Sequence, residues 1–569
     1  MRKDIRDQYS FWLCRAEMDG DLKSELQKMD AAEVEDAFCR NLAFGTGGLR
    51  GIIGAGTNRM NVYTVGKVSQ GLADYVNRYY KQEDRKVAIS YDTRIKSELF
   101  AQVTEGVLAA NGIQVYQYAQ PMPTPCLSFA VRWLHCAAGV MITASHNPCR
   151  YNGYKIYGAD DCQITVPVAD QIFAEIKKLD IFKDIKQASF EAGLRQNYIH
   201  YIEEGVYDAY IDEVKSQSIL DGEKVDKQLS IVYTPLNGTG LKPVLRALKE
   251  SVFSNVHVVK EQELPDGCFP TYPFPNPENP KSMQLGLDMA RQTGADLLLA
   301  IDPDCDRVGI AARNTAGEYI LLNGNETGVL LLDYICARKI ATGTMPKSPV
   351  VIKTIVSSET ARSIARHYGA QVVDVLIGFK FIGEQIGLLE QEDKADCFLF
   401  GFEDSCGYLS GTYVRDKDGV DGALLISEMT DWYKSRGISL PESLEELYRT
   451  YGYCLKLLLS YTFEGASGVS RMDRIMNTFR KQKSHVLLGK RILACVDYSW
   501  GVNGLPNSNV LQYRLQDNIS LVIRPSGTEP KLKAYISIEA KNRRAGQAEA
   551  EKLRAALDAR IYEMQSEVL

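Results

Sequence analysis

The sequence predicts an α/β protein of four sequential domains arranged around a central cleft. Short apolar runs rich in β-branched residues alternate with stretches of helical apolar spacing, a pattern typical of βαβ units and mainly parallel sheets. Four runs end in polar or glycine-rich loops, near residues 145, 304, 404 and 526. These loops are separated by a typical domain length, and ligands of open α/β sheets bind at the carboxyl ends of strands. We therefore expect each domain to contribute one loop to a shared cleft.

The elements follow in chain order from these runs. The expected strands span residues 86–90, 138–142, 229–233, 296–301, 350–353, 398–400 and 519–523. A helix is expected over 101–110, where apolar residues recur at helical spacing. We expect the first three domains to be mixed α/β sheets with helices on both faces, and the fourth to be a smaller α+β lid. The predicted domains span residues 1–205, 206–323, 324–445 and 446–569.

Composition limits the class of protein. Hydrophobic residues make up 45% and charged residues 24% of the 569-residue chain, as in soluble globular proteins. The 66 basic and 72 acidic residues give a net charge of −6, so neither nucleic acid nor an anionic membrane is expected as a partner. An anionic substrate would therefore need a local basic pocket.

The cysteines and the N-terminus indicate the compartment. The 13 cysteines are scattered and odd in number, which favours free thiols in a reducing cytoplasm over disulfides or zinc sites. The first residues contain no apolar segment of signal-peptide length, and no 18-residue apolar run occurs anywhere in the chain. We expect a cytoplasmic protein, and the sequence leaves monomer and dimer equally open.

The first of the four loops is 143–148, with the sequence Thr-Ala-Ser-His-Asn-Pro. It follows the apolar run 138–142, and Pro148 stops that strand because the residue before a proline avoids the helical region. The hydroxyl of Ser145 at a strand end could act as a nucleophile or carry a phosphate. Alternatively, it could simply bond to its own turn.

The second loop, 302–307, reads Asp-Pro-Asp-Cys-Asp-Arg. Carboxylates at Asp302, Asp304 and Asp306 can converge on one point, where their repulsion requires a cation. Hard carboxylate oxygens suit Mg²⁺. An EF-hand is excluded because Arg307 and Arg313 stand where its Gly and Glu belong. A haloacid-dehalogenase-type phosphatase would carry Thr or Val at position 306, and a solvated acidic turn remains an alternative.

The fourth loop, 524–531, reads Arg-Pro-Ser-Gly-Thr-Glu-Pro-Lys after the run 519–523. A guanidinium, two hydroxyls and a flexible glycine can cradle a phosphate dianion. The loop is not a Walker motif, which would require Gly-Lys-Ser/Thr. An ordinary Pro-Ser-Gly turn is the alternative interpretation.

The third loop, 401–407, reads Gly-Phe-Glu-Asp-Ser-Cys-Gly. Glu403 and Ser405 are two positions apart, so in an extended loop both side chains point the same way. A carboxylate beside a hydroxyl suits a vicinal diol, such as that of a sugar. Lys417 follows between two aspartates, where it could also belong to a solvated turn.

Taken together and in this order, the four loops resemble those of the α-D-phosphohexomutase superfamily, and most closely its phosphoglucomutase branch, which includes phosphopentomutase-like members. The resemblance covers nearly the whole chain. Residues 44–51, Phe-Gly-Thr-Gly-Gly-Leu-Arg-Gly, are similar to the family's N-terminal motif, and 274–278, Phe-Pro-Asn-Pro-Glu, to its second-domain signature.

The resemblance implies a role for each loop. Ser145 would be the phosphoserine that gives and regains the phosphoryl group, and also a ligand of Mg²⁺. The other metal ligands would be Asp302, Asp304 and Asp306. The residues that line the reaction centre would be Arg50, His146, Lys155 and Arg307. Lys155 and Lys417 would be the general acid/base candidates, and the sequence does not rank them. The substrate-binding residues would be Arg307, Gly378, Glu403, Ser405 and Lys417, and the phosphate-binding residues Arg524, Ser526, Gly527 and Thr528.

The implied reaction interconverts glucose 1-phosphate and glucose 6-phosphate, with glucose 1,6-bisphosphate as activator and intermediate and small sugar phosphates as the binding partners. Two departures concern the substrate: Asn237 stands where many relatives carry His, and Ile377 where Thr is usual. The Ile377 change could alter a sugar contact. Pentose or mannose phosphates therefore remain alternative substrates, and a metal-dependent sugar phosphatase or a non-catalytic sensor are further alternatives.

Overall fold

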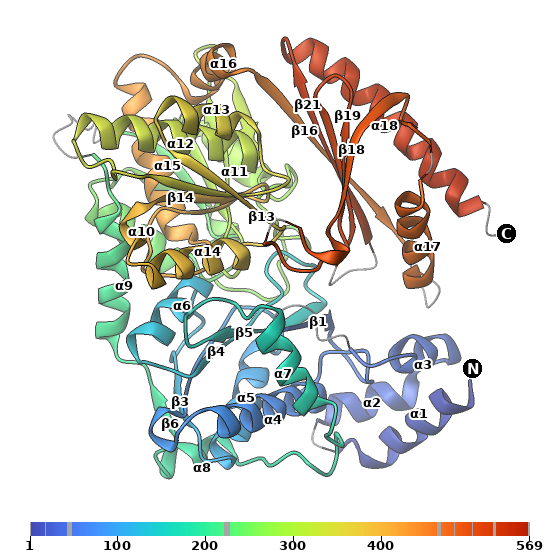
Figure 1. Ribbon diagram of the computed structural model, residues 1–569. Helices are drawn as coiled ribbons and strands as arrows, with labels where there is room; N and C mark the ends of the chain where they lie inside the picture. The colour runs from blue at the N-terminus through green and yellow to red at the C-terminus, as the bar shows by residue number, and fades with distance from the viewer. Residues whose placement is uncertain are drawn as a thin grey trace.

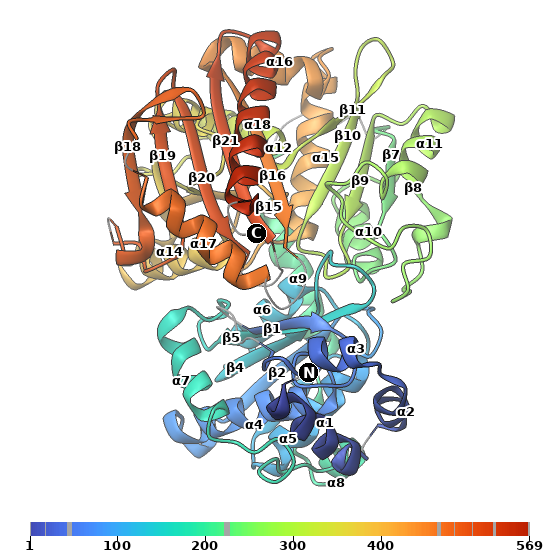
Figure 2. The ribbon, with the colours of Figure 1, turned by 90° about the vertical axis from the view of Figure 1, so that its right-hand side faces the viewer.

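The computed structural model describes residues 2–17, 19–42, 48–220, 228–463, 468–482, 484–502, 504–526 and 531–566. It contains four β-sheets, each built from one continuous stretch of the chain, and the sheets follow one another in sequence order (Figures 1 and 2). The predicted α/β class with four sequential units is confirmed. The exact division at residues 206, 324 and 446 remains a prediction.

The first sheet has the order β1-β5-β4-β2-β3-β6. Strands β4, β2, β3 and β6 are parallel, and β5 alone runs antiparallel to them. The edge strand β1 pairs antiparallel with β5 and therefore has the same direction as the other four. The strand bounds are β1 Gly48–Ile52, β2 Lys86–Tyr91, β3 Gln114–Gln117, β4 Ala138–Ile142, β5 Tyr151–Gly158 and β6 Ile199–Tyr201. The helix bounds are α4 Val62–Tyr79, α5 Ser97–Ala110, α6 Thr124–Trp133, α7 Val166–Ile176, α8 Phe190–Arg195 and α9 Glu204–Ser216.

Both faces of this sheet are covered because its strands carry apolar side chains at successive positions. Val87 and Ile89 pack into the cluster formed with α4, α5 and α7, whereas Ala88 packs on the opposite face with α6. Such strands, apolar on both faces, are typical of parallel sheets buried between helices.

Three N-terminal helices precede this unit and were not predicted. They are α1 Lys3–Arg15, α2 Gly20–Lys28 and α3 Ala31–Phe38. Trp12 is buried edge-to-face against Phe38, Tyr63 and Phe182, so the helices share an apolar core with the first sheet.

The second and third sheets are mixed, with mostly parallel strands and an antiparallel edge. The second has the order β11-β10-β9-β7-β8 and the third β13-β12-β14-β15. The second unit contains β7 Ile231–Thr234, α10 Leu241–Glu250, β8 Val256–Val258, α11 Gln284–Thr293, β9 Leu297–Ile301, β10 Val308–Arg313 and β11 Tyr319–Leu322. The third contains α12 Gly324–Ala341, β12 Val350–Thr354, α13 Thr360–His367, β13 Gln371–Val375, α14 Lys380–Gln391, β14 Phe398–Glu403, β15 Gly407–Leu409, α15 Gly419–Lys434 and α16 Leu440–Tyr451.

One apolar core joins the first three units. It extends from α6 and α9 through the second sheet to α12 and the third sheet, and a few side chains of the fourth unit, such as Tyr453 and Val522, pack at its edge. Helix α15 packs against α10 and against β9 and β10 of the second sheet, although it follows the third sheet in sequence (Figure 2). The second and third units are therefore held together by a large shared apolar interface.

The fourth sheet is antiparallel throughout, with the order β16-β21-β20-β19-β18-β17. The elements are β16 Tyr453–Thr462, α17 Gly468–Arg480, β17 Val486–Leu487, β18 Lys490–Asp497, β19 Leu511–Leu515, β20 Ile519–Pro525, β21 Lys531–Ala540 and α18 Arg543–Ser566. Helices α17 and α18 cover one face of the sheet, and the other face looks toward the third unit (Figure 1). No helix of the described residues combines the length and apolar character needed to cross a membrane.

The fold positions the site because β4, β9, β14 and β20 each end at the cleft. The strands predicted at 138–142, 296–301, 398–400 and 519–523 are present, each within a few residues of the expected bounds. The loop that follows each strand therefore emerges between the units.

A buried acid in the first unit gives a test of this core. Both carboxylate oxygens of Glu105 on α5 are buried, and neither has a hydrogen-bond partner among the described residues. Burial, with a smaller effect of Glu98, raises the pKa of Glu105 from 4.5 to about 8. The folded state thus favours the protonated acid, so the stability that Glu105 contributes is complete below pH 4.5 and is lost as the pH rises through about 8.

We expect Glu105→Gln to melt at a higher temperature than the wild type at pH 8.5, by an amount equivalent to a few kcal/mol (order of magnitude). The difference should shrink toward pH 5, because the wild-type side chain is then neutral as well. Calorimetric melting across this pH range would measure it, with the exposed Glu83→Gln in the same unit as control. A difference that does not change with pH would contradict the assignment.

Candidate functional site

Ser145 lies directly after β4, in the turn that ends at Pro148. Its side chain is buried, and its backbone φ of 51° lies in the left-handed region that non-glycine residues rarely adopt. The hydroxyl donates a hydrogen bond of 2.6 Å to Oδ2 of Asp302. Nδ1 of His146 lies 3.1 Å from the same hydroxyl. The turn therefore directs Ser145 Oγ at the second unit's acidic loop.

The acidic loop after β9 brings three carboxylates together. Ligand oxygens of Asp302, Asp304 and Asp306 all lie within 4.8 Å of one another, and all three residues are fully buried. Oδ1 of Asp302 accepts from the backbone N–H groups of Asp306 and Arg307, each at 3.1 Å. Oδ1 of Asp304 and Oδ1 of Asp306 have no hydrogen-bond partner among the residues that the structure describes.

The electrostatics of this trio favour a bound cation. Burial, followed by repulsion from Asp304 and Asp306, raises the pKa of Asp302 far above its usual range. Burial and Asp304 likewise raise the pKa of Asp306. Burial also opposes ionisation of Asp304, but the Lys155 ammonium outweighs it and lowers the pKa of that carboxyl. Partnerless, buried carboxylate oxygens around one point are the donor set that a hard divalent cation binds.

Two lysines from different units flank the trio. Nζ of Lys155 on β5 donates to Oδ2 of Asp304 at 2.8 Å and to Oδ2 of Asp306 at 3.4 Å. Nζ of Lys417 lies 2.9 Å from Oδ2 of Asp306 and 3.3 Å from Oδ1 of Asp416. Burial acts against both charges, yet the carboxylates prevail and raise the pKa of both lysines. Both side chains are therefore ammonium ions at neutral pH, and their geometry does not rank them.

Arg307 connects the acidic loop to the loop after β14. Its Nη1 donates to the carbonyl of Ser405 at 3.3 Å, while its Nε lies 3.8 Å from Oδ2 of Asp302. Ser405 Oγ donates in turn to Oε1 of Glu403 at 2.9 Å. The two side chains that the sequence pairs as diol ligands are thus on the same side of their loop.

A cavity of about 470 Å³ opens above these groups. Its lining comes from all four units, since it includes the first unit's Arg50 and the fourth unit's Arg524. The predicted site residues that line it are Arg50, His146, Arg307, Gly378, Glu403, Ser405, Arg524 and Ser526. Ser145, the acidic trio, Lys155 and Lys417 are absent from the lining and are buried beside it. Gly527, Thr528 and residues 43–47 lie outside the described residues.

The cavity also contains residues that sequence reasoning missed. Lys531 and Lys533 on β21 line it, and Lys533 pairs in register with Arg524 on β20. The alternating pattern Lys531-Leu-Lys533 could have indicated two cations on one face of a strand. Lys380 is a further cavity cation, and burial lowers its pKa to about 8.

The imidazole of His146 is neutral although it lies beside acids. Burial, followed by the cations Arg307, Arg50 and Lys533, lowers its pKa well below the usual range. The positive charge in the cavity therefore comes from guanidinium and ammonium groups. Of the two departures, Ile377 lines the cavity, whereas Asn237 lies outside its lining.

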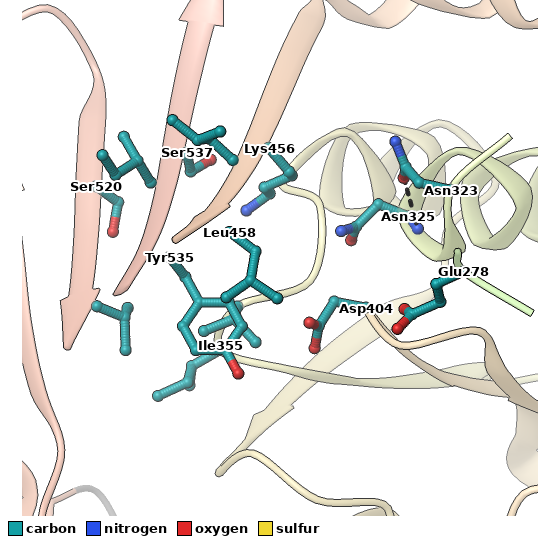
Figure 3. A pocket seen from close by; sticks show the side chains of 14 residues that line it. Glu278, Asn323, Asn325, Ile355, Asp404, Lys456, Leu458, Ser520, Tyr535 and Ser537 are labelled. Atoms are coloured by element: carbon teal, nitrogen blue, oxygen red, sulfur yellow. Dashed lines mark hydrogen bonds between the residues drawn. The ribbon is translucent and has the colours of Figure 1, made fainter. Parts of the chain in front are cut away.

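A second cavity of about 150 Å³ separates the third unit from the open face of the fourth sheet (Figure 3). Lys456 on β16 lies on one side, and Asn325, Asp404 and Glu278 lie on the other (Figure 3). Burial lowers the pKa of Lys456 and raises that of Asp404 to about 6. The boundary between the third and fourth units thus contains ionisable side chains beside apolar ones such as Ile355 and Leu458.

Comparisons with known proteins agree on one family. Models of "Phosphoglucomutase/phosphomannomutase, alpha/beta/alpha" domains I, II and III match residues 41–181, 208–317 and 323–451. A phosphoglucomutase of Staphylococcus saprophyticus is 37% identical over 88% of this chain and 91% of its own length. A phosphoglucomutase of Staphylococcus aureus is 35% identical over 93% of this chain and 95% of its own.

Solved structures show the same fold at lower identity. A putative phosphomannomutase from Thermus thermophilus superimposes with a TM-score of 0.67, at 22% identity, over 91% of this chain and 99% of the other. The open form of parafusin, a phosphoglucomutase from Paramecium, gives a TM-score of 0.66 at 15% identity over 93% and 96% of the two chains.

The acidic trio makes a direct prediction about cation binding. We expect MgCl₂ to raise the melting temperature of the wild type, since a ligand at a hundred times its dissociation constant stabilises by about 2.7 kcal/mol. Asp306→Asn should lose most of this response, because it removes one of the clustered charges. Asp404→Asn is the matched control, a cleft carboxylate outside the trio, and should keep it. The melting temperatures would be measured by scanning calorimetry after EDTA treatment, with and without MgCl₂. An equal rise in all three proteins would contradict a cation site at the trio.

Proposed function

Because the chain belongs to the phosphoglucomutase/phosphomannomutase family, we propose that it is a phosphosugar mutase that interconverts glucose 1-phosphate and glucose 6-phosphate. The observation that carries the proposal is the 2.6 Å contact between Ser145 Oγ and Asp302 in the buried carboxylate trio. A serine hydroxyl at this position can carry a phosphoryl group beside a metal site. The phosphoglucomutases of Staphylococcus, similar over most of the chain, support glucose phosphate as substrate.

The metal that fits the trio is Mg²⁺, which would be held by Asp302, Asp304, Asp306 and an oxygen on Ser145. When bound, Mg²⁺ would neutralise carboxylates and act as a Lewis acid toward phosphoryl oxygens. A phosphate on Ser145 would add about 1.5 to 2 negative charges beside the trio. The family and the two partnerless oxygens support this assignment.

The first half of the reaction moves the phosphoryl group from Ser145 to a sugar hydroxyl. Arg307 reaches from the acidic loop to the sugar loop, so its guanidinium can stabilise the charge of the group in transit. As the Ser145 O–P bond breaks and the sugar O–P bond forms, the serine oxygen gains a proton and the sugar hydroxyl loses one. Lys155 and Lys417 are charged at rest, so either can donate a proton to the serine oxygen and then take up the proton released by the sugar hydroxyl, which restores the ammonium; the second half runs in reverse. His146, being neutral, can orient the hydroxyl without adding charge.

The second half requires the sugar bisphosphate to turn around. The phosphate that is not being transferred would be bound by Arg524, Ser526, Lys531 and Lys533. Because these residues would recognise the charge of the phosphate, they could bind either the 1-phosphate or the 6-phosphate of the sugar. Glu403 and Ser405 would bind sugar hydroxyls in both orientations. We assign the fourth unit the role of a lid that closes over the cavity to exclude water.

The compartment and the substrate class complete the proposal. All thirteen cysteines are free, which supports a reducing cytoplasm.

Pentose and mannose phosphates stay as alternative substrates, because Ile377 lines the cavity without the hydroxyl that Thr would provide.

Ser145→Ala tests the mechanism. With Mg²⁺ and catalytic glucose 1,6-bisphosphate, we expect the wild type to form glucose 6-phosphate. Ser145→Ala should lose activity by roughly 10³-fold or more, since it lacks the hydroxyl that carries the phosphoryl group. Full isomerase activity in Ser145→Ala would refute the assignment.

Two measurements in the same assay separate the alternatives. Release of inorganic phosphate without isomer would identify a phosphatase. Values of kcat/KM for glucose, mannose and ribose 1-phosphates, each with its bisphosphate, would identify the sugar, and a preference for ribose would replace glucose in the proposal.

Lys533 tests the distal phosphate site. We expect Lys533→Met to raise KM for glucose 1-phosphate about 10- to 100-fold, the equivalent of one charge-assisted hydrogen bond. The control Lys541→Met removes an exposed cation just beyond the same strand and should leave KM unchanged. Equal kinetics in the two variants would remove Lys533 from the site.

A further inference from the structure

Arg94 is a buried arginine that no part of the proposed reaction uses. It lies in the loop between β2 and α5, and its side chain is inaccessible to solvent. Nη2 donates to the carbonyls of Ser145 and Asn147, and Nη1 to those of Pro148 at 3.0 Å and Tyr151 at 3.1 Å. One planar guanidinium therefore holds three carbonyls of the turn that carries the serine and the carbonyl of Tyr151, the first residue of β5.

A second path leads from Arg94 to the serine through Asp92. Nε of Arg94 lies 3.3 Å from Oδ2 of Asp92, and the Thr143 hydroxyl donates to the same oxygen at 2.6 Å. Oγ1 of Thr143 in turn accepts from the backbone N–H of Ser145 at 2.8 Å. The N–H and the carbonyl of Ser145 are thus fixed by one network. A left-handed non-glycine residue costs on the order of 1 kcal/mol or more, so its conformation needs such support.

The same loop also contacts the second unit, which carries the acidic trio. The Arg94 guanidinium carbon lies 5.0 Å from the centre of the Phe269 ring. Thr93 Oγ1 donates to the carbonyl of Asn237 at 2.9 Å. A Cβ at Gly267 would lie 2.5 Å from the backbone N of Ile95. The backbone of the second unit therefore approaches this loop of the first unit closely. The loop therefore lies at the joint between the nucleophile turn and the metal-binding unit.

We propose that Arg94 is a positioning residue that sets the direction of Ser145 Oγ toward the acidic trio and fixes the nucleophile turn against the second unit. The proposal rests on the function proposed above for Ser145. In-line transfer needs the reacting atoms in a narrow range of geometry, and a displacement of about 1 Å can cost roughly 10²-fold in rate. Lysine cannot replace the guanidinium, because one ammonium cannot reach four carbonyls in a plane.

Arg94→Lys is the primary test, with Arg132→Lys as matched control. Arg132 also binds a carbonyl and two carboxylates, but between the first and third units, away from the cavity. We expect Arg94→Lys to lower kcat about 10²-fold with KM for glucose 1-phosphate within about threefold of the wild type, since the cavity wall is unchanged. Arg132→Lys should keep kcat within about twofold, whatever its melting temperature.

Thr143 provides a second test if Arg94→Lys fails to fold. Thr143→Val removes the hydroxyl that links Asp92 to Ser145 and should lower kcat about 10-fold at constant KM, and Thr143→Ser should restore it. Equal kcat in wild type and Thr143→Val, or a loss that Thr143→Ser does not repair, would overturn the proposal.

A crystal structure of Thr143→Val gives a readout that does not depend on activity. We expect Ser145 Oγ to leave hydrogen-bond distance of Asp302, and an unchanged contact would also overturn the positioning role. Inactivity of the wild type on every sugar phosphate would instead refute the proposed function, so the two failures are distinguishable.

Discussion

The mutual repulsion of three buried carboxylates is the constraint on which this structure depends. Two unit charges 4 Å apart repel by about 4 kcal/mol at an effective dielectric constant near 20, so Asp302, Asp304 and Asp306 cannot all be ionised without compensating charge. The chain provides part of it from other units: Lys155 comes from the first and Lys417 from the third. The acidic loop therefore acts as an electrostatic centre that joins units already united by an apolar core. Oδ1 of Asp304 and Oδ1 of Asp306 are left without a hydrogen bond among the described residues, and these two buried oxygens indicate where a cation fits.

The charge of the cavity differs from that of the whole chain. The chain carries a net charge of −6, yet the fourth unit lines the cavity with Arg524, Lys531 and Lys533. An anionic ligand would therefore meet a local basic surface on an acidic protein. Burial is the main cause of the lowered pKa of His146, and the neighbouring cations lower it further because they disfavour an additional positive charge.

The sequence predicts these features unevenly, for physical reasons. Apolar runs identify β4, β9, β14 and β20, and because ligands bind beyond strand ends, the loops carrying Ser145 and the acidic trio could be predicted. Arg94 also follows a strand, β2, so the same rule would have drawn attention to its loop. The short pattern Asp92-Thr93-Arg94, however, is too common in sequences to indicate a function. Lys533 lies within a strand and not in a loop after one, so this rule does not apply to it. That it lies beside Arg524 becomes clear only from the pairing of β20 with β21. The packing of α15 on the second sheet depends on tertiary contacts between units, which local periodicity does not encode.

The contrast between the unit interfaces bears on how a mutase could handle one ligand in two orientations. The first three units share an apolar core, which resists relative displacement because separating it would expose buried surface. The fourth unit instead has an apolar core of its own, contributes few residues to the shared core, and meets the third unit across a cavity lined by Lys456 and Asp404 as well as by apolar side chains (Figure 3). Displacing the fourth unit would expose less of the shared core than displacing one of the other three, so it is the less costly motion. The chemistry would then stay on the rigid part of the molecule, where Arg94 and Asp92 hold the serine, while β20 and β21 would move with the fourth unit.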